Sequence, residues 1–321
     1  MSNRALITGG SGFVGQWLAR ALIEESWTVT SASTSKPDTA AVLSAAERGA
    51  VRWLELDMRI AGDVARAVVE SRPDVVFHLA GVSSVPEAQA APDLAYDVNV
   101  LGAARLLGDL SRRRKVGELD PVVLVIGSGT QYGRHDRADL PLNEAAEQRP
   151  LDVYAASKAA QEIASLQFHR ADGLRVICTR SFNHSGLGHA SHFLLPALVR
   201  RALALARSAG GELRIGNADS VRDYLHVADV VRAYRLLIER GVPGEVYNVC
   251  SGEGVSVREL AEDVLLRVGT TAEITIDPAL VRGVDIHTLV GSPAKLQRAT
   301  GWRRAKTRAD IIDDLIHAAT H

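Results

Sequence analysis

Cysteine is scarce in this chain, which has only two, Cys178 and Cys250, among 321 residues. Both lie in apolar runs typical of buried strands, so we expect two buried thiols in a reducing compartment rather than a disulfide framework. The first residues, Met1–Thr8, lead straight into an apolar strand, without the basic segment and long apolar stretch of a secretory signal. We therefore expect a cytoplasmic protein.

A charge imbalance and long hydrophobic runs are also missing. The formal net charge is −1, which gives no reason to expect nucleic acid or an anionic membrane as a partner. No apolar stretch approaches the roughly 20 residues that span a bilayer. His189 and His192 are three residues apart, but no carboxylate or cysteine near them completes a metal site, so no metal is expected.

What the first half does contain is a regular alternation of short β-branched runs and amphipathic stretches. The predicted strands are Ala5–Thr8, Thr28–Ser33, Val51–Leu56, Asp74–Ala80, Val122–Ser128 and Arg175–Phe182. The predicted helices are Phe13–Glu25, Ile60–Ser71, Leu94–Arg114 and Val153–Arg170. Strands that alternate with helices form a parallel sheet covered on both faces. Right-handed crossovers make that sheet doubly wound, as in the Rossmann fold.

After Phe182 the pattern becomes a mixture of helices and strands. Predicted helices are Phe193–Arg207, Val227–Glu239, Val257–Val268 and Ala309–Ala319, and predicted strands are Leu213–Ile215, Glu245–Cys250 and Glu273–Ile276. No repeat and no Pro/Gly/Ser linker separates the halves, so they are expected to share one cleft. The sequence predicts a dinucleotide-binding Rossmann domain over residues 1–182, to which 227–252 return, and a smaller α+β substrate-binding region over 183–321.

A glycine-rich loop follows the first predicted strand at once and opens a predicted helix. Glycine lets the backbone turn tightly and lets its amides approach a pyrophosphate with no Cβ in the way. The helix N-terminus adds unpaired N–H groups and the positive end of its dipole. The sequence therefore predicts a dinucleotide site at Gly9, Gly12, Phe13, Val14 and Gly15.

The end of the second predicted strand bears on which nicotinamide cofactor binds. A carboxylate there would accept the ribose hydroxyls of NAD, but the chain reads Ser33-Thr34-Ser35-Lys36. Hydroxyls and a lysine suit a 2′-phosphate, so Ser33 and Lys36 favour NADP(H), with NAD(H) remaining possible. Asp57 lies where the third predicted strand ends, in a position to face the adenine.

Tyr154 and Lys158 are four residues apart, which places them on one face of a predicted helix. A tyrosine has a pKa near 10 in model peptides, and a nearby ammonium lowers that pKa and allows proton exchange with a carbonyl oxygen. Ser128 ends the fifth predicted strand, at the edge where such sheets hold their ligands. It can hold the reacting oxygen by a hydrogen bond.

Together with the glycine loop, Asp57, the run His78-Leu79-Ala80-Gly81, Asn99 and the Ser128, Tyr154 and Lys158 group resemble the extended short-chain dehydrogenase/reductase family over essentially the whole chain. The resemblance implies that Ser128, Tyr154 and Lys158 form a catalytic triad and that Lys158 contacts the nicotinamide ribose. It also places further residues at the cofactor: Asp57 and Met58 near the adenine, and Leu79, Ala80, Gly81 and Asn99. A homodimer through the helices Leu94–Arg114 and Tyr154–Arg170 is implied as well.

Within that family, four segments of the second half are most similar to the branch that contains reductases of GDP-4-keto-6-deoxy-mannose and GDP-mannose 4,6-dehydratases. They are Arg180–His184, Arg222–Val227, Tyr247–Gly252 and the pair Arg282 and Asp285. The resemblance implies that Asn183 and Arg222 bind the diphosphate of a nucleotide sugar and that Arg282 binds its nucleotide end. Arginine forks pair well with phosphate oxygens.

The residue at position 130 separates the reactions of this family. Its sugar dehydratases carry a glutamate there as the acid–base group for eliminating water, whereas this chain has Thr130, which cannot take a proton from carbon at neutral pH. We therefore expect NADP(H)-dependent reduction of a 4-keto group on a nucleotide sugar. The alternatives are a 4-epimerase with tightly bound NAD, less readily a 4,6-dehydratase, and a non-catalytic dinucleotide-binding protein.

Two segments depart from the pattern of the relatives, at Gly186-Leu187-Gly188 and at Val82-Ser83-Ser84. Both fall where the sugar is expected, with Ser83 and Thr130 as candidate substrate contacts. The identity of the sugar, or reduction of a different ketone, therefore stays open on the sequence alone.

Overall fold

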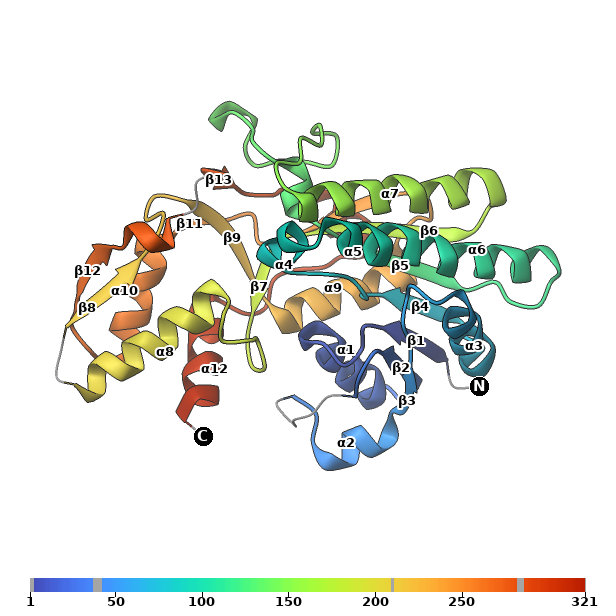
Figure 1. Ribbon diagram of the computed structural model, residues 1–321, viewed down its shortest axis with the longest axis horizontal. Coiled ribbons are helices and arrows are strands. Elements are labelled where there is room, and N and C mark those ends of the chain that lie inside the picture. The colour runs from blue at the N-terminus through green and yellow to red at the C-terminus, as the bar shows by residue number, and fades with distance from the viewer. Residues whose placement is uncertain (1–2, 37–41, 209–210, 282–285, 321) are drawn as a thin grey trace.

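The computed structural model describes residues 3–36, 42–208, 211–281 and 286–320, and its centre is a seven-stranded sheet (Figure 1). The strands are β1 (Arg4–Thr8), β2 (Thr28–Ser33), β3 (Arg52–Glu55), β4 (Val75–His78), β5 (Val122–Ser128), β6 (Arg175–Ser181) and β10 (Val246–Val249). All pair in parallel, in the order β10-β6-β5-β4-β1-β2-β3. The predicted doubly wound parallel sheet is confirmed, and its strand order reverses between β1 and β4, where such sheets bind ligands.

Helices cover both faces of this sheet, as Figure 1 shows. Helices α1 (Phe13–Glu24) and α9 (Val227–Arg240) pack on one face, and α3 (Ala61–Ser71), α6 (Gly102–Lys115) and α7 (Val153–Asp172) pack on the other. The short helix α2 (Ala45–Ala50) lies beside α1. Because both faces are buried, the central strands β4 and β5 are mainly apolar, as in other covered parallel sheets.

The helix expected over Leu94–Arg114 is not continuous. After α4 (Val85–Ala90), the chain forms α5 (Pro92–Tyr96), a π-helical turn η1 (Asp97–Leu101) and only then α6. A π-helical turn widens the backbone by one residue and is frequent at functional sites. Here it contains Asn99, which is fully buried.

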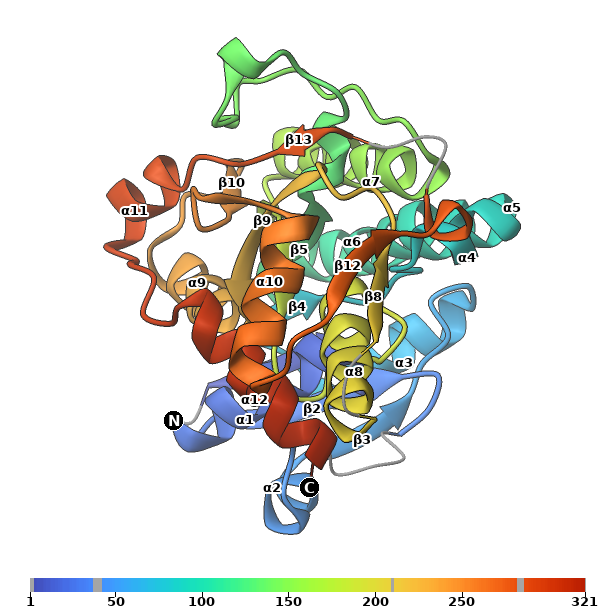
Figure 2. The same cartoon turned by 90° about the vertical axis from the view of Figure 1, so that its left-hand side faces the viewer.

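The remaining elements form a second layer around its own core, seen end-on in Figure 2. It contains the helices α8 (Leu194–Arg207), α10 (Val257–Val268) and α12 (Arg308–Thr320), and the parallel strand pair β8 (Glu212–Ile215) and β12 (Glu273–Ile276). The division of the chain at residue 182 stays a prediction. No helix of the described residues is long and apolar enough to cross a membrane.

A small sheet joins the two layers. It consists of β7 (Asn183–Ser185), β9 (Val221–His226), β11 (Gly254–Ser256) and β13 (Thr288–Leu289). The sequence analysis did not predict these four strands or the helix α11 (Ala294–Thr300). The short 3-10 turns are η2 (Gly129–Tyr132), η3 (Arg137–Asp139) and η4 (Pro278–Leu280).

The outer edge of β10 is occupied by side chains rather than by another strand. The Asn248 backbone N–H donates to Glu144 Oε1 at 2.8 Å, and Lys295 Nζ donates to the Val246 carbonyl at 2.7 Å. Both partners come from outside the sheet, Glu144 from the loop before α7 and Lys295 from α11. Two backbone groups on the side of β10 that does not face β6 are therefore satisfied by side chains.

Candidate active site

The glycine loop between β1 and α1 is packed so tightly that side chains do not fit at two of its positions. Gly9 has φ +73°, and a Cβ there would lie 2.7 Å from the backbone nitrogen of Ala80. A Cβ on Gly15 would lie 2.5 Å from Gly10 Cα. Helix α1 begins at Phe13 and its N-cap, Gly12, offers no side-chain hydrogen bond. The first N–H groups of α1, including those of Phe13 and Val14, therefore suit an anionic ligand such as a pyrophosphate.

The ends of β2 and β3 lie side by side at the same edge of the sheet. Ser33 Oγ accepts a hydrogen bond from the Ser11 backbone N–H at 3.0 Å, which ties the end of β2 to the glycine loop. Lys36 is exposed three residues further on. Asp57 follows β3, and Arg59 grips its carboxylate, with Nε to Oδ1 at 2.9 Å and Nη2 to Oδ2 at 2.6 Å.

The Arg59 contact changes how Asp57 can act. Its hydrogen bonds lower the pKa of Asp57 against the opposing effect of burial, so the carboxylate stays charged but is neutralised by its partner. Met58, the next residue, is buried. Arg59 was not among the predicted site residues, although this cation lies only two residues after Asp57 in the sequence.

Asn99 holds the loop after β4 against α7. Its Oδ1 accepts from the Val82 N–H at 2.8 Å, and its Nδ2 donates to the Val82 carbonyl at 3.2 Å and to Ser157 Oγ at 2.8 Å. Both ends of the amide are therefore engaged with protein atoms. Asn99 fixes the path of the backbone through Leu79, Ala80 and Gly81 past the switch point.

Ser128, Thr130 and Tyr154 meet at the carboxyl end of β5. Ser128 Oγ and Thr130 Oγ1 are 2.8 Å apart, and the Ser128 hydroxyl is also hydrogen-bonded to that of Tyr154. Tyr154 lies in the first turn of α7, whose N-terminus is capped by Asp152, which accepts from the Ala155 N–H at 2.8 Å. Two hydroxyls and a phenol thus converge on one point.

The acidity of Tyr154 differs from the prediction. A nearby ammonium was expected to lower the pKa of Tyr154, but burial raises this pKa, and the hydrogen bond with Ser128 offsets the rise in part. The physical reason is that Lys158 Nζ points to Gln161 Oε1, at 2.7 Å. Burial lowers the pKa of Lys158 to about 8.

A buried polar network links the backbone of Ser128 to side chains of α7 and β6. Gln131 Oε1 accepts from the Ser128 N–H at 2.6 Å, and Gln131 Nε2 donates to Glu162 Oε2 at 3.0 Å. Arg180 pairs with the same carboxylate through Nε, at 2.9 Å, and Nη2, at 2.7 Å, and stacks on Tyr132. In the sequence, Arg180 stands out only as part of a motif, and nothing there marks Glu162 as its partner.

The substrate candidates lie on β7 and β9, which are neighbouring strands. Asn183 begins β7, opposite Tyr224 of β9, and Arg222 of β9 donates to the Val221 carbonyl at 2.8 Å. Ser83 is exposed in the loop after β4. Arg282 and Asp285 lie outside the described residues. The structure thus brings Ser128, Thr130 and Tyr154 together, with Lys158 one turn further along α7, and places Asn183 and Arg222 on the adjoining small sheet.

The segment Gly186-Leu187-Gly188 lies against the start of α1. Trp17 Nε1 donates to the Leu187 carbonyl at 2.9 Å, and His189 stacks on Phe13 with 4.7 Å between ring centroids. His184 Nδ1 donates to the Phe182 carbonyl at 2.9 Å, because a carbonyl oxygen only accepts. These contacts join the two layers next to the glycine loop.

The doubly wound sheet, the glycine loop at its switch point and the Ser–Tyr–Lys group are those of an NAD(P)-dependent enzyme of the extended short-chain dehydrogenase/reductase class. Residues 6–315 match the family model described as GDP-mannose 4,6 dehydratase. The chain belongs to that family.

Individual relatives show which enzymes it resembles. The chain is 35% identical over 306 residues to the GDP-6-deoxy-D-mannose reductase of Pseudomonas aeruginosa, with 94% of this chain and 92% of the relative covered. Its structure is similar to that of RMD from Pseudomonas aeruginosa complexed with NADPH, with a TM-score of 0.80, 31% identity and 99% of both chains covered. It is also similar to the Thermus thermophilus UDP-glucose 4-epimerase complex with NAD, with a TM-score of 0.85, 28% identity and 99% of both chains covered.

Proposed function

We propose that this protein uses NADPH to reduce the 4-keto group of a nucleotide sugar of the GDP-4-keto-6-deoxy-mannose type. The observation that carries the proposal is the Thr130 hydroxyl 2.8 Å from Ser128 Oγ, at the position where dehydratases of the family have a glutamate. Two hydroxyls can hold a carbonyl oxygen, but neither can remove a proton from carbon at neutral pH. Similarity to a reductase, and to a structure solved with NADPH, supports the same reading.

Ser128, Tyr154 and Lys158 each have a separate role in such a reduction. The nicotinamide, when bound at the switch point, supplies the hydride that reaches the carbonyl carbon. Ser128 donates a hydrogen bond to the carbonyl oxygen and so orients it, and Tyr154 gives its phenolic proton to that oxygen as charge develops there. Lys158, charged below a pH of about 8, stabilises the phenolate that remains. Asn183 and Arg222 hold the diphosphate on the adjoining small sheet.

The proposal is tested with purified protein, GDP-4-keto-6-deoxy-mannose and NADPH, by following absorbance of the reduced nicotinamide. We expect one NADPH to be consumed for each sugar alcohol formed. A protein that leaves NADPH unchanged, carries bound NAD as purified and inverts a sugar hydroxyl is instead a 4-epimerase. That second candidate is supported by the similarity to the epimerase solved with NAD.

We propose NADPH rather than NADH because Ser33 ends β2 without a carboxylate and Lys36 is exposed nearby, while Arg59 neutralises Asp57. In Lys36→Ala, the KM for NADPH will rise about tenfold, the effect of losing one charge-assisted hydrogen bond. The KM for NADH will stay within about twofold because NADH has no 2′-phosphate for the lysine to bind. Lys115→Ala, a change at an exposed lysine on α6, is the control, and an equal rise for both cofactors would contradict the assignment.

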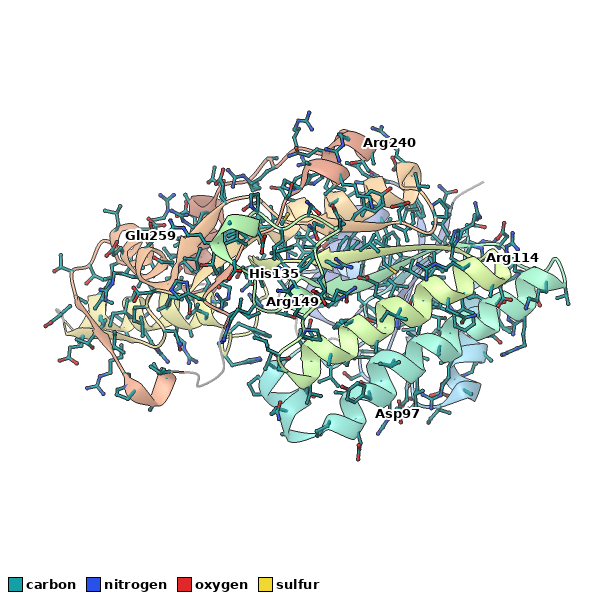
Figure 3. All side chains as sticks on the ribbon, turned by 90° about the horizontal axis from the view of Figure 1, so that it is seen from above. Asp97, Arg114, His135, Arg149, Arg240 and Glu259 are labelled. Carbon is teal, nitrogen blue, oxygen red and sulfur yellow. The ribbon has the colours of Figure 1, made fainter. Side chains whose placement is uncertain are left out.

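We further propose a homodimer that forms through α6 and α7. Figure 3 shows the two helices side by side at the surface, with Asp97 near one end and Arg114 near the other. Three large apolar side chains are exposed on these helices or on the turns before α6: Tyr96 of α5 at 39%, Leu101 of η1 at 51% and Ile163 of α7 at 64%. Light scattering will give twice the mass of the chain for the wild type and the monomer mass for Ile163→Glu, since an unpaired carboxylate opposes burial. A wild-type protein that is monomeric at micromolar concentration contradicts the proposal.

The two free thiols, Cys178 and Cys250, are both buried. A reducing compartment suits such a protein, and we place the proposed activity in the cytoplasm.

A further inference from the structure

Gln161 contacts Lys158, but the proposed mechanism gives Gln161 no role. Lys158 Nζ donates to Gln161 Oε1 at 2.7 Å. The two residues are three apart on α7, so their side chains share one face of the helix. Lys158 is 5% exposed and Gln161 is fully buried. Water therefore cannot replace the carboxamide as the acceptor for this ammonium.

The backbone and side chain of Gln161 are fixed differently. Ser165 Oγ donates to the Gln161 carbonyl at 2.7 Å, which anchors this turn of α7. The side-chain Nε2, however, is buried without a hydrogen-bond partner in the part of the chain that the structure describes. A buried amide group without a partner is destabilising by roughly 1–3 kcal/mol. A leucine would avoid this penalty, so packing alone does not explain a glutamine at this position.

The groups that surround Lys158 carry no compensating negative charge. His78 of β4 and Cys178 of β6 lie in the same row across the sheet, both beside Val125 of β5, and so point to the face that α7 covers. Burial, together with the Lys158 charge, lowers the pKa of His78 to about 3, so this ring is neutral. Burial raises the pKa of the Cys178 thiol, which is neutral too.

The charged neighbours on α7 and β6 are already paired. Glu162 is bound by Arg180 through two hydrogen bonds, and the Tyr154 phenol is neutral because burial raises its pKa. Across the described residues, the Gln161 oxygen is the one hydrogen-bond acceptor recorded for the Lys158 ammonium. Gly81 also lies close to the Lys158 ammonium, since a Cβ on Gly81 would lie 3.6 Å from Lys158 Nζ.

We propose that Gln161 is a positioning residue that holds the Lys158 ammonium in its protonated state at the edge of the active site. The inference rests on the proposed role of Lys158 and deepens it. A buried ammonium needs an acceptor to remain charged. A neutral carboxamide supplies one without the strong ion pair that a carboxylate would form, so Lys158 remains available to the cofactor and to Tyr154.

Two substitutions separate this role from simple packing. Gln161→Leu keeps the volume but removes the acceptor, so the pKa of Lys158 will fall by about one unit or more, the equivalent of a hydrogen bond to a charged group. Gln161→Glu keeps an acceptor oxygen and adds a negative charge, so the same pKa will rise. Because reduction requires charged Lys158, the alkaline limb of the kcat profile moves to lower pH in the leucine variant and to higher pH in the glutamate variant.

The lysine can also be titrated directly, without any substrate. The chain has only five lysines, so the side-chain carbon signal of Lys158 can be followed by NMR and identified by its loss in Lys158→Met. Gln167→Leu, a change at an exposed glutamine two turns along α7, is the control and will leave the titration unchanged. The melting temperature of each variant shows whether it is folded.

The outcomes distinguish this inference from the proposed function. Opposite shifts of the Lys158 titration in the leucine and glutamate variants support the inference even if the sugar substrate is wrong. If the two folded variants titrate like the wild type, or shift in the same direction, Gln161 does not control the proton on Lys158. In that case the inference is overturned whatever the enzyme reduces.

Discussion

Tyr154→Phe will lower kcat for ketone reduction by about a thousandfold, within the range that a positioned general acid contributes. The substitution removes only the phenolic oxygen, so the ring can still pack against Val82, Ala88 and Ala95. Ser128 and Thr130 remain to hold the carbonyl oxygen, but no proton is delivered to that oxygen. Hydride transfer to carbon then leaves an unprotonated alkoxide in a buried site, which is unfavourable.

Binding separates this effect from a loss of structure. The Kd for NADPH, measured by quenching of protein fluorescence, will stay within about threefold of the wild-type value, because the glycine loop makes the main phosphate contacts. Tyr96→Phe, a change on α5 at a tyrosine that is 39% exposed, is the matched control and will leave kcat unaltered. A Tyr154→Phe variant that turns over at a rate close to the wild type would show that another group donates the proton.

Glu162→Gln will reduce the free energy of unfolding by about 3–5 kcal/mol, as expected when one partner of a buried ion pair is removed. The Glu162 and Arg180 side chains are only 5% and 6% exposed. Burial opposes the charge on Arg180, but the hydrogen bonds that it donates to Glu162 raise its pKa. Without the carboxylate, the guanidinium remains charged and buried. The glutamine keeps only one acceptor oxygen, so either Gln131 or Gln148 also loses its acceptor.

Urea unfolding followed by circular dichroism measures this loss as a lower midpoint. The matched control is Glu253→Gln, which removes the carboxylate of the Arg304–Glu253 pair. Glu253 is 65% exposed, so its loss will change stability by less than about 1 kcal/mol. Equal midpoints for the two variants would mean that the buried network does not stabilise the fold.

The sheet and its helices could be predicted because their signals are local. β2 (Thr28–Ser33), β5 (Val122–Ser128) and α10 (Val257–Val268) occur within the predicted bounds, since short runs with β-branched residues favour strands and a covered helix repeats every 3.6 residues. The glycine loop was visible for the same reason. The residues that form this loop are neighbours in the sequence, so the loop can be recognised without knowing any distant contact.

The missed elements depend on distant partners. β9 reads Val-Arg-Asp-Tyr-Leu-His, without a clear alternation, because buried Asp223 accepts from Ser251, Gly252 and Gly291. The π-helical turn at Asn99 leaves the apolar spacing of its helix nearly unchanged, so periodicity predicts one continuous helix. Both features depend on contacts that no local window of the sequence contains.

The site was predicted in its reacting groups but not in their support. Ser128, Tyr154 and Lys158 could be recognised because their spacing resembles that of the extended short-chain dehydrogenase/reductase family. Gln161 and Glu162 look like ordinary helix residues in the sequence, and only the structure shows that both are buried. Polar residues are buried when a partner is available, and here the partners are one turn away for Gln161 and on β6 for Glu162.

During synthesis, the last strand of the main sheet emerges from the ribosome well before Lys295, which bonds its outer edge. In that interval the Val246 carbonyl has no Lys295 to satisfy it, and an unpaired sheet edge can accept a strand from another nascent chain. Parallel sheets also form slowly because their contacts are distant in sequence. Chains that end before α11 lack this contact, and we expect them to aggregate more readily than the full chain.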